Sequence, residues 1–480
     1  MRFLKTCTAG AMCSLLAACM HVPPAPVSLD AKVTEAAATG FDREKVAQTA
    51  RAIAATAPVA ADAPDRLSLL AALILYDPRI AQAQKALAVA QREALSSRKV
   101  GSPSFSLTGQ YSNDPTTEPW QGSIGASLPL DYGGVRAARL TRADVAVLIA
   151  RDDLAETIWA ERMAARASLI DGLIARRRQA LLTHQVALRE QILQALDARL
   201  RAGEGTAIER DTARIALRQT QRALEDTRWL LADARARLAA TLGLPQAALA
   251  GVEFQWDDFA DPAANPPVPD AALAHRAVVS RADVLRSVAA YDQSEADLRG
   301  ELARQYPQVT LQPSMTWAGG PMTLPFGLGL SMPSWDRNRA TIRAAVARRE
   351  AAGASIHTAV TNALGAIDTA GQESRAARVA LDHVRNGEWP AALSAARRAE
   401  QRRSVGETGR IEALTMQAGA LDAEITLTDA LGRVQKADAA LEDALRRPLS
   451  GPETRIDMLN LTKTPLAVAT PVAAKGPETK

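Results

Sequence analysis

The stretch that decides the fold is residues 203–245, which read GEGTAIERDTARIALRQTQRALEDTRWLLADARARLAATLGLP. A shift of 203 residues along the chain places a similar stretch at 406–448, and the two align without a gap. The identical positions are Gly203, Glu204, Ile208, Glu209, Leu224, Asp226, Leu238, Leu242 and Pro245, which recur as Gly406, Glu407, Ile411, Glu412, Leu427, Asp429, Leu441, Leu445 and Pro448. Arg199 and Arg402, four residues before each glycine, obey the same shift. A repeat of this length indicates a duplicated structural unit, so the chain is predicted to contain two similar halves.

Long helices are predicted on both sides of each glycine turn. No proline occurs from Leu130 to Leu244, and a single helix over 135–202 would have 68 residues and a length of about 100 Å. Such a helix needs neighbours, and heptad spacing predicts coiled-coil packing. The heptad positions are Leu217, Leu224, Leu231 and Leu238 in the first half, and Leu427, Val434 and Leu441 in the second. Gly387 and Pro390 are expected to kink the outgoing helix of the second half.

Composition agrees with long helices better than with large globular cores. At 480 residues the chain is long enough for several domains, yet only 4% of its residues are aromatic. The 57 basic and 53 acidic residues leave a formal charge of +4, which falls to about +2 without Arg2 and Lys5 and is then too weak to dictate a partner. The interleaving of arginine and aromatic residues that is typical of nucleic-acid binding is missing. The densest basic run, Arg176–Arg178, is interpreted as a solvated helix face.

The first 18 residues are interpreted as a signal peptide. Arg2 and Lys5 precede a short apolar run that ends in LAAC at 16–19. This ending resembles the lipobox of bacterial lipoproteins, which implies cleavage before Cys19 and acylation of Cys19. An ordinary secretory signal is the alternative. All three cysteines lie in residues 1–19, so the mature chain is expected to form no disulfide.

Residues 19–66 are predicted to be a lipidated tether with at most one short helix, Arg43–Ala55, because the stretch is rich in alanine and proline. Met20, rather than an aspartate, follows Cys19. The resemblance to lipoproteins then implies the outer membrane as the location, with the chain extending into the periplasm.

Four segments alternate between apolar and small polar residues, as transmembrane strands do: about 104–111, 121–129, 308–317 and 323–332. Two half-buried hairpins of a soluble sheet would show the same alternation. The polar faces hold no charge, and Tyr111, Trp120 and Trp317 lie at strand ends, which favours strands in a membrane. Pro313 and Pro325 are unfavourable, since proline removes a ladder hydrogen bond.

Geometry then predicts an oligomer. The apolar run at 67–76 is ten residues long, too short to span a bilayer as a helix. Four strands cannot close a barrel, and an open sheet edge in lipid leaves backbone groups unpaired. Three chains supply about twelve strands, enough to enclose a lumen. The long helices are expected to continue that lumen as a tube.

Several motifs are similar to those of one family: LPLDYGG at 128–134, MPSWDRNR at 332–339, Asp77-Pro78, SRADV at 280–284 and Tyr306-Pro307. In order and spacing over both repeats they resemble the outer membrane efflux channel family, the TolC-like exit ducts. The family usually has asparagine where this chain has Asp77, and proline where it has Ala282. The resemblance implies a mainly α-helical homotrimer with a shared twelve-stranded transmembrane β-barrel and a long helical tunnel.

The resemblance also divides the chain. Residues 67–250 form the first repeat, with its hairpin turn at 203–206, and residues 273–448 form the second, with its turn at 405–408. An equatorial belt includes the connection 251–272. The tail, 449–480, is either disordered or part of that belt.

At the two turns, the resemblance implies contact with a periplasmic adaptor. The residues matching that tip motif are Arg199, Gly203, Thr206, Arg402, Gly406 and Gly409. Helix capping explains the same residues more simply: a glycine ends one helix, and Thr206 or Thr408 starts the next. Glu412 matches a family position that constricts the pore, although Thr415 replaces a possible second acid. An exposed glutamate in a first helical turn is also a favourable partner of the helix dipole.

The predicted function is that of an outer membrane exit duct in a tripartite efflux pump, working with an adaptor and an inner-membrane transporter of the RND type. A periplasmic coiled-coil adaptor or scaffold lipoprotein is the alternative. No enzyme, metal site or cofactor is predicted, because the five histidines are isolated and no phosphate-binding loop occurs. The adjacent acids Asp152 and Asp153 are interpreted as solvated charge. The substrate stays open among drugs, solvents and heavy metals.

Overall fold

The computed structural model describes residues 22–54, 62–99, 102–113, 116, 119–130, 134–256, 258–262, 269–320, 322–332 and 338–456. The predicted signal peptide, Cys19 and residues 457–480 of the tail lie outside the described residues. So do 131–133 and 333–337 of the two family motifs that join strand to helix.

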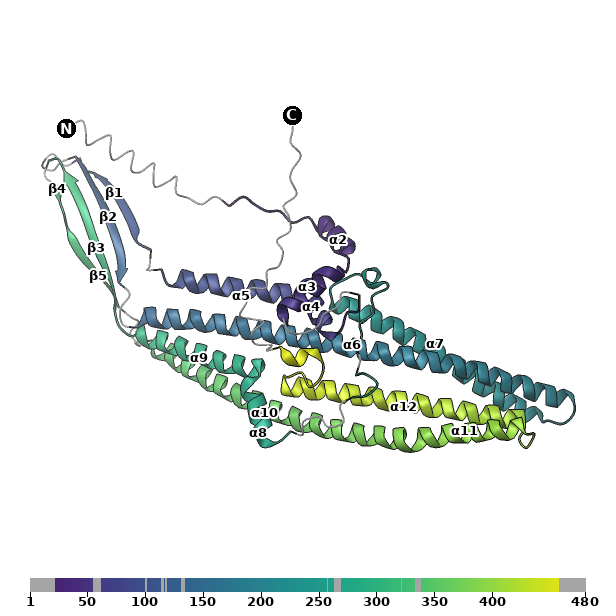
Figure 1. Cartoon of the computed structure of the whole chain (residues 1–480). Coiled ribbons are helices and arrows are strands. Elements are labelled where there is room, and N and C mark those ends of the chain that lie inside the picture. Colours follow the sequence, from purple (N-terminus) through teal and green to yellow (C-terminus); the bar gives the residue numbers. More distant parts are fainter. Residues whose placement is uncertain are drawn as a thin grey trace, which may run out of the picture.

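The molecule is elongated, with a sheet at one end and two helical turns at the other (Figure 1). Helix α6, Val135–Arg201, runs for 67 residues, or about 100 Å, between the two ends. Its single long span confirms the helix predicted over 135–202. Helix α7, Ala207–Thr241, returns antiparallel to it. Its heptad leucines Leu217, Leu224 and Leu238 are buried, as the predicted coiled-coil seam requires.

The second half repeats this hairpin with one irregularity. Helix α10 (Arg339–His383) passes through a π-helical turn, η2 (Val384–Glu388), into α11 (Trp389–Ser404), and α12 (Arg410–Leu445) returns. The irregularity lies where Gly387 and Pro390 predicted one. Pro390 occupies the first turn of α11, where a missing N–H costs least.

Four further helices accompany the first part of α6 and α10. Helices α4 (Arg66–Tyr76) and α5 (Pro78–Ser97) precede the first strand pair. Helices α8 (Ala271–Ser280) and α9 (Ala282–Ala303) precede the second. The two halves thus share one order of elements: short helix, longer helix, strand pair, long hairpin. Two short 3₁₀ turns, η1 (Gln246–Leu249) and η3 (Pro452–Arg455), follow the two hairpins.

The N-terminal stretch departs from the predicted tether. It holds two helices, α2 (Leu29–Ala38) and α3 (Arg43–Ile53), rather than at most one. Ser28 and Asp42 start them, because each side chain accepts hydrogen bonds from the first turn of its helix. Helix α3 buries Val46, Ala47 and Ala50, so this part of the segment belongs to the folded core.

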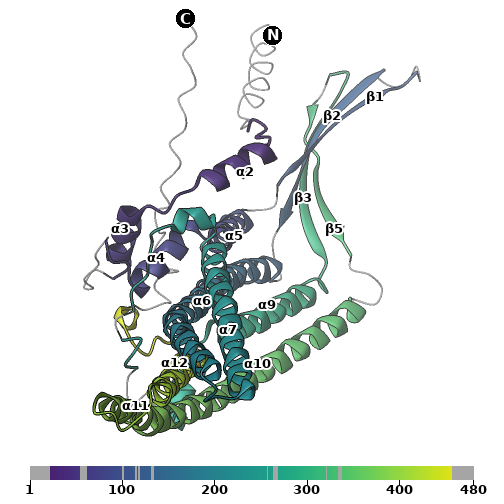
Figure 2. The same cartoon turned by 90° about the vertical axis from the view of Figure 1, so that its right-hand side faces the viewer.

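The principal core lies midway along the molecule, where α3 and α4 pack on α6 beside the ends of α7 and α12 (Figure 2). Leu67, Leu70 and Leu73 of α4 are fully buried there. The apolar run at 67–76 is therefore a core helix. Among the described residues, no helix has the length and apolar character needed to cross a bilayer.

The strands form one antiparallel sheet that joins the two halves. Strands β1 (Ser104–Tyr111) and β2 (Trp120–Leu130) come from the first half, and β3 (Gln308–Ala318) pairs with β2. Strands β4 (Met322–Thr323) and β5 (Phe326–Ser331) both pair with the other edge of β3.

The expectation of one uninterrupted fourth strand at 323–332 was wrong. Pro325 separates β4 from β5 because it has no N–H to donate to the ladder. Its carbonyl still accepts a hydrogen bond from the Ser314 N–H at 3.0 Å, and β4 and β5 keep one register against β3. Pro313 lies within β3, opposite Phe326 of β5, but the pairing of β3 with β2 skips residues 312 and 313.

Candidate functional site

The sheet separates its side chains completely by polarity. Because directly opposed residues of an antiparallel pair share a face, the register assigns every strand residue to one of two faces. The large apolar residues that share one face are Phe105, Leu107, Tyr111, Trp120, Ile124, Leu128, Leu130, Val309, Leu311, Met315, Trp317, Met322, Phe326, Leu328 and Leu330. The other face consists of Ser, Thr, Gln, Gly, Ala and one Pro, without a charge.

The apolar face has nothing to cover it within the described chain. Phe105 is 76% exposed and Leu328 is 65% exposed, values that isolated soluble sheets avoid. Tyr111 and Trp120 face each other across the turn end of β1 and β2, with ring centroids 4.9 Å apart. A uniformly apolar face opposite an uncharged polar face suits a sheet with lipid on one side and water on the other.

Both outer edges of the sheet are open. Among the described residues β1 pairs only with β2, and β4 and β5 pair only with β3. Each edge presents unpaired backbone N–H and C=O groups, which offer a template for another strand.

The connection between α6 and α7 is stabilised by helix capping at both of its ends. Gly203 has a φ of +75°, a left-handed conformation that favours glycine. Its N–H donates to the Leu200 carbonyl at 3.0 Å, and the Glu204 N–H donates to the Arg199 carbonyl at 3.0 Å, the two bonds of a Schellman motif. Arg199 Nη2 also donates to the Glu204 carbonyl at 3.1 Å.

Thr206 begins the return helix with a capping box. The Glu209 N–H donates to Thr206 Oγ1 at 3.2 Å, and the Thr206 N–H donates to Glu209 Oε2 at 3.1 Å. The bond from the Thr206 N–H lowers the pKa of the Glu209 carboxyl, and the Thr206 hydroxyl lowers it further.

The second turn closes its helix in the same way but starts the next one differently. Gly406 has a φ of +81°, and the N–H groups of Gly406 and Glu407 donate to the carbonyls of Arg403 and Arg402 at 3.1 and 2.9 Å. The expectation that Thr408 starts the return helix was wrong. Gly409 is the N-cap, and no side chain caps this helix.

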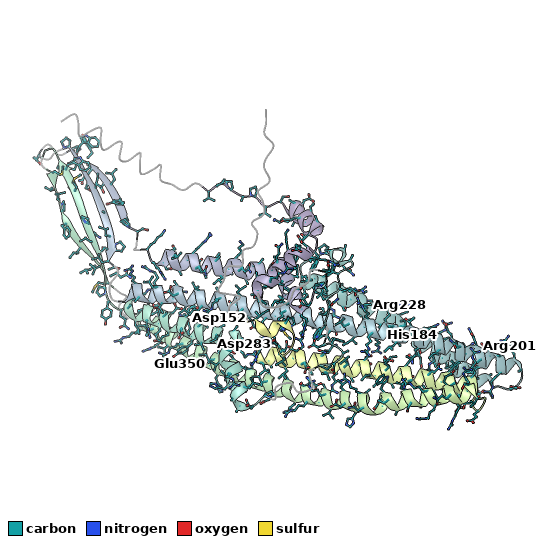
Figure 3. All side chains as sticks on the ribbon, viewed as in Figure 1. Asp152, His184, Arg201, Arg228, Asp283 and Glu350 are labelled. Atoms are coloured by element: carbon teal, nitrogen blue, oxygen red, sulfur yellow. The ribbon has the colours of Figure 1, made fainter. Side chains whose placement is uncertain are left out.

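Glu412 consequently differs from its repeat counterpart Glu209. Gly409 stands where the first copy has Thr206, so the Glu412 carboxylate has no hydroxyl to form a capping box. Within the described part of the chain it makes no hydrogen bond or ion pair, and it is exposed at the end of the molecule. Arg201, which ends α6, marks the neighbouring first turn in Figure 3.

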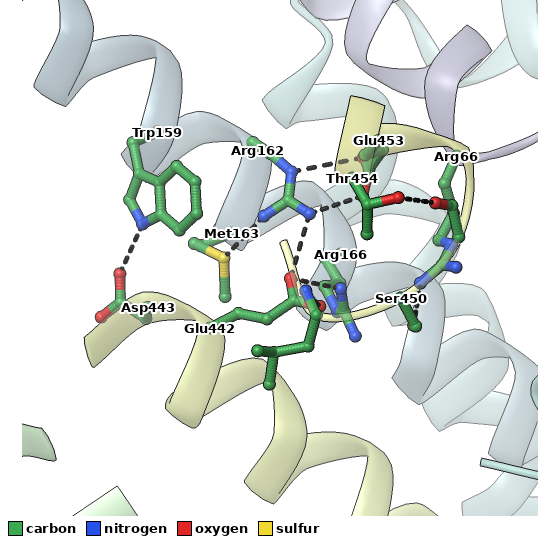
Figure 4. Close-up of polar contacts among 12 residues, drawn as sticks. Arg66, Trp159, Arg162, Met163, Arg166, Glu442, Asp443, Ser450, Glu453 and Thr454 are labelled. Carbon is green, nitrogen blue, oxygen red and sulfur yellow. Dashed lines mark hydrogen bonds and ion pairs between the residues drawn. The ribbon is translucent and has the colours of Figure 1, made fainter. Parts of the chain in front are cut away.

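A buried ion cluster joins the two halves at mid-length, and sequence reasoning missed it (Figure 4). Arg162 Nη2 on α6 donates to Glu442 Oε2 on α12 at 3.0 Å and to Glu453 on η3. Arg166 Nη1 donates to the same Glu442 oxygen at 2.6 Å. Exposure of all four side chains is 5% or less.

The charges in this cluster are stabilised both by ion pairs and by contacts of guanidinium groups with an aromatic ring. Burial acts to lower the pKa of Arg162, but the carboxylates of Glu453 and Glu442 outweigh it and raise that pKa. The guanidinium groups of Arg66 and Arg166 lie 4.5 and 4.8 Å from the ring centre of Trp256. A signal was present in the sequence, since Arg162 and Arg166 lie four residues apart among apolar residues of α6 that face the core.

The interpretation of Asp152 as solvated charge was wrong. Its side chain is buried, with one ion pair, to Arg151 Nη2 at 3.1 Å. Burial raises the pKa of the Asp152 carboxyl. Asp153 remains on the surface, where it pairs with Arg286. Neighbouring residues of a helix point in different directions, so one acid enters the core while the next stays outside.

Outside the buried ion cluster, titratable residues occur along the length of the molecule. Asp152 and His184, for example, lie well apart along the molecule in Figure 3. Within the described ranges, no group of three or more His, Cys, Asp or Glu side chains is arranged to hold a metal ion.

Three comparisons place these features among known proteins. The sequence profile described as "Outer membrane efflux protein" matches residues 69–244 and again 273–445, one match to each half. The cobalt-zinc-cadmium resistance protein CzcC of Cupriavidus metallidurans is 23% identical over 324 residues, which cover 67% of this chain and 76% of CzcC.

Solved structures share the fold at lower identity. The CmeC outer membrane channel of Campylobacter jejuni superposes with a TM-score of 0.67 and 13% identity, covering 93% of this chain and 97% of CmeC. The outer membrane protein VceC of Vibrio cholerae gives a TM-score of 0.65 and 17% identity, covering 79% of this chain and 95% of VceC.

Proposed function

The chain belongs to the outer membrane efflux protein family, and from that membership we propose that three copies form a closed exit duct. Efflux across the outer membrane is the function of this channel family. The finer proposal is a twelve-stranded barrel in the membrane, continued in the periplasm by a tunnel of long helices. An adaptor would meet the tunnel at the helix tips, and an inner-membrane transporter of the RND type would supply the energy.

The observation that carries the proposal is the sheet. Its two open edges need strand partners, and its apolar face needs lipid, while its uncharged polar face suits a water-filled lumen. Three copies joined edge to edge satisfy all three needs at once, because three sheets make about twelve strands. A periplasmic adaptor or scaffold would have no use for such a sheet.

The order of elements supports the proposed division of the chain. Repeats at 67–250 and 273–448 each contribute a strand pair and a hairpin. Of the connection 251–272 and the residues after 448, the described residues Phe254, Trp256, Phe259 and Ile456 pack in or against the principal core. Cleavage before Cys19 and its acylation would add a lipid anchor. Substitution Cys19→Ala should abolish incorporation of labelled palmitate. If the signal peptide is an ordinary secretory one, the mature wild-type protein should instead carry no added acyl mass.

At the tips, we assign adaptor contact to Arg199, Gly203, Thr206, Arg402, Gly406 and Gly409, and the constriction of the pore to Glu412. Three uncapped Glu412 carboxylates around one axis would attract cations and repel one another. Glu209, held in its capping box, would contribute less.

Single-channel recording in planar bilayers tests this proposal. Wild-type protein should give small, cation-preferring openings, and Glu412→Gln should enlarge them or reduce their selectivity. Glu209→Gln serves as the matched control and should leave selectivity nearly unchanged. Conductance unaffected by Glu412→Gln would retain the channel and remove the constriction. Absence of conductance, with a monomer in solution, would reject the duct.

Substrate class requires a separate measurement. The name of CzcC connects that relative with cobalt, zinc and cadmium. If this chain exports such cations, deletion of its gene should sensitise the cell to these metals more than to organic dyes; the reverse order would assign it to drug efflux.

A further inference from the structure

The elbow between α4 and α5 is packed against two other elements of the first half. Asp77 ends α4 and is the N-cap of α5. An added Cβ at Gly243, in the turn after α7, would lie 2.5 Å from Pro78 Cδ and 2.9 Å from the Tyr76 carbonyl oxygen. The elbow also meets α6, where Arg79 pairs with the Glu161 carboxylate. Movement of this elbow would therefore disturb both α6 and the end of α7.

Two acids are buried at this elbow beside a single base. The side chains of Asp77 and Glu161 are 0% and 9% exposed, whereas that of Arg79 is 53% exposed. Arg79 Nε lies 3.5 Å from Asp77 Oδ1, and Arg79 Nη2 lies 2.6 Å from Glu161 Oε2. One guanidinium thus contacts both carboxylates. With both acids ionised, the three side chains carry a net negative charge in the core.

Hydrogen bonds do not satisfy the two carboxylates. Asp77 Oδ1 accepts a hydrogen bond from the Arg79 backbone N–H at 2.8 Å. Among the described residues, no donor reaches the buried Asp77 Oδ2, and Glu161 Oε2 has its ion pair with Arg79 but no donor in hydrogen-bonding geometry. A buried ionised oxygen without a donor is unfavourable. A proton on one of the acids would remove part of this cost.

Capping does not explain why both residues are acids. An N-cap has to accept hydrogen bonds from the first turn of its helix, and asparagine does this as well as aspartate. The charge of Asp77 is therefore not needed for the cap of α5. Glu161 lies in the interior of α6, where it caps nothing.

We propose that Asp77 and Glu161 form a proton-binding pair, which takes up one proton from solvent in acid and thereby stabilises the joint of α5, α6 and the turn after α7. With Glu161 protonated, the guanidinium of Arg79 balances the one charge that remains, on Asp77. We call Asp77, Arg79 and Glu161 the acid joint. It goes beyond the proposed duct, because all of its parts come from one copy of the chain.

The groups around Glu161 determine the sign of the effect. Burial raises the pKa of the Glu161 carboxyl, the charge of Asp77 raises it further, and Arg79 lowers it, so that the pKa lies above its ordinary value. A carboxyl of this kind stabilises the folded state fully below its unfolded pKa, and the stabilisation is lost as the pH rises through the raised pKa. The acid joint should therefore be more stable at mildly acidic pH than at alkaline pH.

Other charges near the acid joint are few. Arg162, the next residue of α6, donates instead to Glu442 and Glu453 of the buried ion cluster. The stretches that lead to the elbow along α4 and follow α7 carry no charge; they are residues 67–76 and 242–245.

Amide hydrogen exchange in the first two turns of α5 tests the acid joint in the full-length protein. Protection factors are compared, because they remove the effect of pH on the exchange chemistry itself. Glu161→Gln should raise protection about threefold at about pH 8, and the gain should shrink as the pH falls toward about 5. Asp77→Asn keeps the N-cap and should reduce the dependence of wild-type protection on pH, since Glu161 then loses the repulsion.

Asp270→Asn is the matched control. Asp270 is an exposed N-cap, of α8 in the second half, and it accepts a hydrogen bond from the Leu273 N–H at 2.6 Å. This variant should leave protection in α5 unchanged at every pH. An equal response of α5 to Asp270→Asn and Asp77→Asn would overturn the acid joint.

Arg79→Gln separates repulsion between the acids from ion pairing. Without the guanidinium, two buried acids have no base, so protection in α5 should fall about threefold at about pH 8 and recover as the pH falls. Lower protection in Glu161→Gln than in wild type at alkaline pH would overturn the proposal, because the ion pair would then outweigh the repulsion. So would effects of Asp77→Asn and Glu161→Gln that add in the double variant, since interacting residues are not additive.

Infrared difference spectroscopy detects the proton itself and does not depend on stability. On acidification, wild-type protein should show the carbonyl stretch of a protonated buried carboxyl, and Glu161→Gln should lack this component. In Asp77→Asn the component should appear only at lower pH. Identical spectra of wild type and Glu161→Gln would overturn the acid joint, and none of these outcomes bears on the conductance by which the duct is tested.

Discussion

The two copies of the helical hairpin share the backbone conformation that ends the outgoing helix, but they differ in the contacts that their side chains make. Both end the outgoing helix with a left-handed glycine and the same pair of hydrogen bonds. Only the first starts its return helix with a capping box. Only the second contains a π-turn, and its return helix buries a glutamate, Glu442. Glu442 corresponds to Ala239 in the first copy. The same hairpin backbone is therefore compatible with different side-chain contacts in the two copies.

The largest effect is expected from Glu442→Ala, which makes the second copy match the first. This change leaves Arg162 and Arg166 buried with Glu453 alone, and an uncompensated buried charge costs about 3–5 kcal/mol of unfolding free energy. Denaturant unfolding measures the loss. The control is Glu424→Ala, whose half-exposed pair with Arg177 at 3.8 Å is worth under about 1 kcal/mol. Equal losses for the two variants would contradict the role given to the cluster.

A smaller loss is expected from Gly432→Ala. The new methyl group would lie 2.4 Å from Ile174 Cδ1, so α12 and α6 must move apart or Ile174 must leave its rotamer. Overpacking of this kind costs about 1–3 kcal/mol. Thermal unfolding should show the loss, and Gly419→Ala on the same helix, where nothing lies within 4 Å of the new Cβ, should instead be neutral or stabilising. Equal stability of the two variants would show that the contact is not tight.

The N-cap residues of α7 and α12 predict that substitutions there change the stability in opposite directions. Thr206→Ala removes the capping box and should cost about 1 kcal/mol. Gly409→Ser supplies the missing cap in the second copy and should add a few tenths of a kcal/mol. Amide hydrogen exchange in the first turns of α7 and α12 reports both changes locally. Faster exchange in α12 of Gly409→Ser would contradict the assignment of Gly409 as N-cap.

The smallest effect is a pH dependence of stability that is confined to the turn between α6 and α7. The capping box lowers the pKa of Glu209 below its ordinary value of 4.5. Because the pKa of Glu209 is lower in the folded turn, its ionised carboxylate stabilises that turn at pH values above the ordinary pKa. This contribution to stability is lost as the pH falls through the lowered pKa. The carboxyl chemical shift of Glu209 should therefore titrate at lower pH in wild type than in Thr206→Ala. Thr206→Ser, which keeps the hydroxyl, should resemble wild type.

Much of the fold follows from local signals in the sequence. Glycine turns, heptad leucines and the long stretch without proline predicted α6 and its return, because each signal depends on nearby residues. The strands were recognisable from alternation alone. Pro325 interrupted the fourth one, as the missing N–H of proline would suggest, yet the carbonyl of Pro325 still kept the register.

The parts that could not be predicted depend on residues far apart in the chain. Nothing near Glu442 indicates that Arg162 and Glu453 surround it. Nor does the composition of residues 19–66 reveal that α3 packs into the principal core. At the second turn, Thr408 was a reasonable cap, but Gly409 has the extended backbone that an N-cap requires. The assignment of Glu412 to a pore is still a prediction, since it depends on where other copies lie.

The ion cluster has a consequence for the order in which the chain can finish folding. Its partners are supplied by residues 162, 166 and 442 and, last, by Glu453 on the short turn η3. Until that final carboxylate has been synthesised and has docked, two arginines compete for one glutamate in the centre of the molecule. A chain interrupted before Glu453 therefore carries an excess positive charge that resists burial, and such a chain would be held open to proteases. Docking of η3 thus completes the charge balance of this buried cluster.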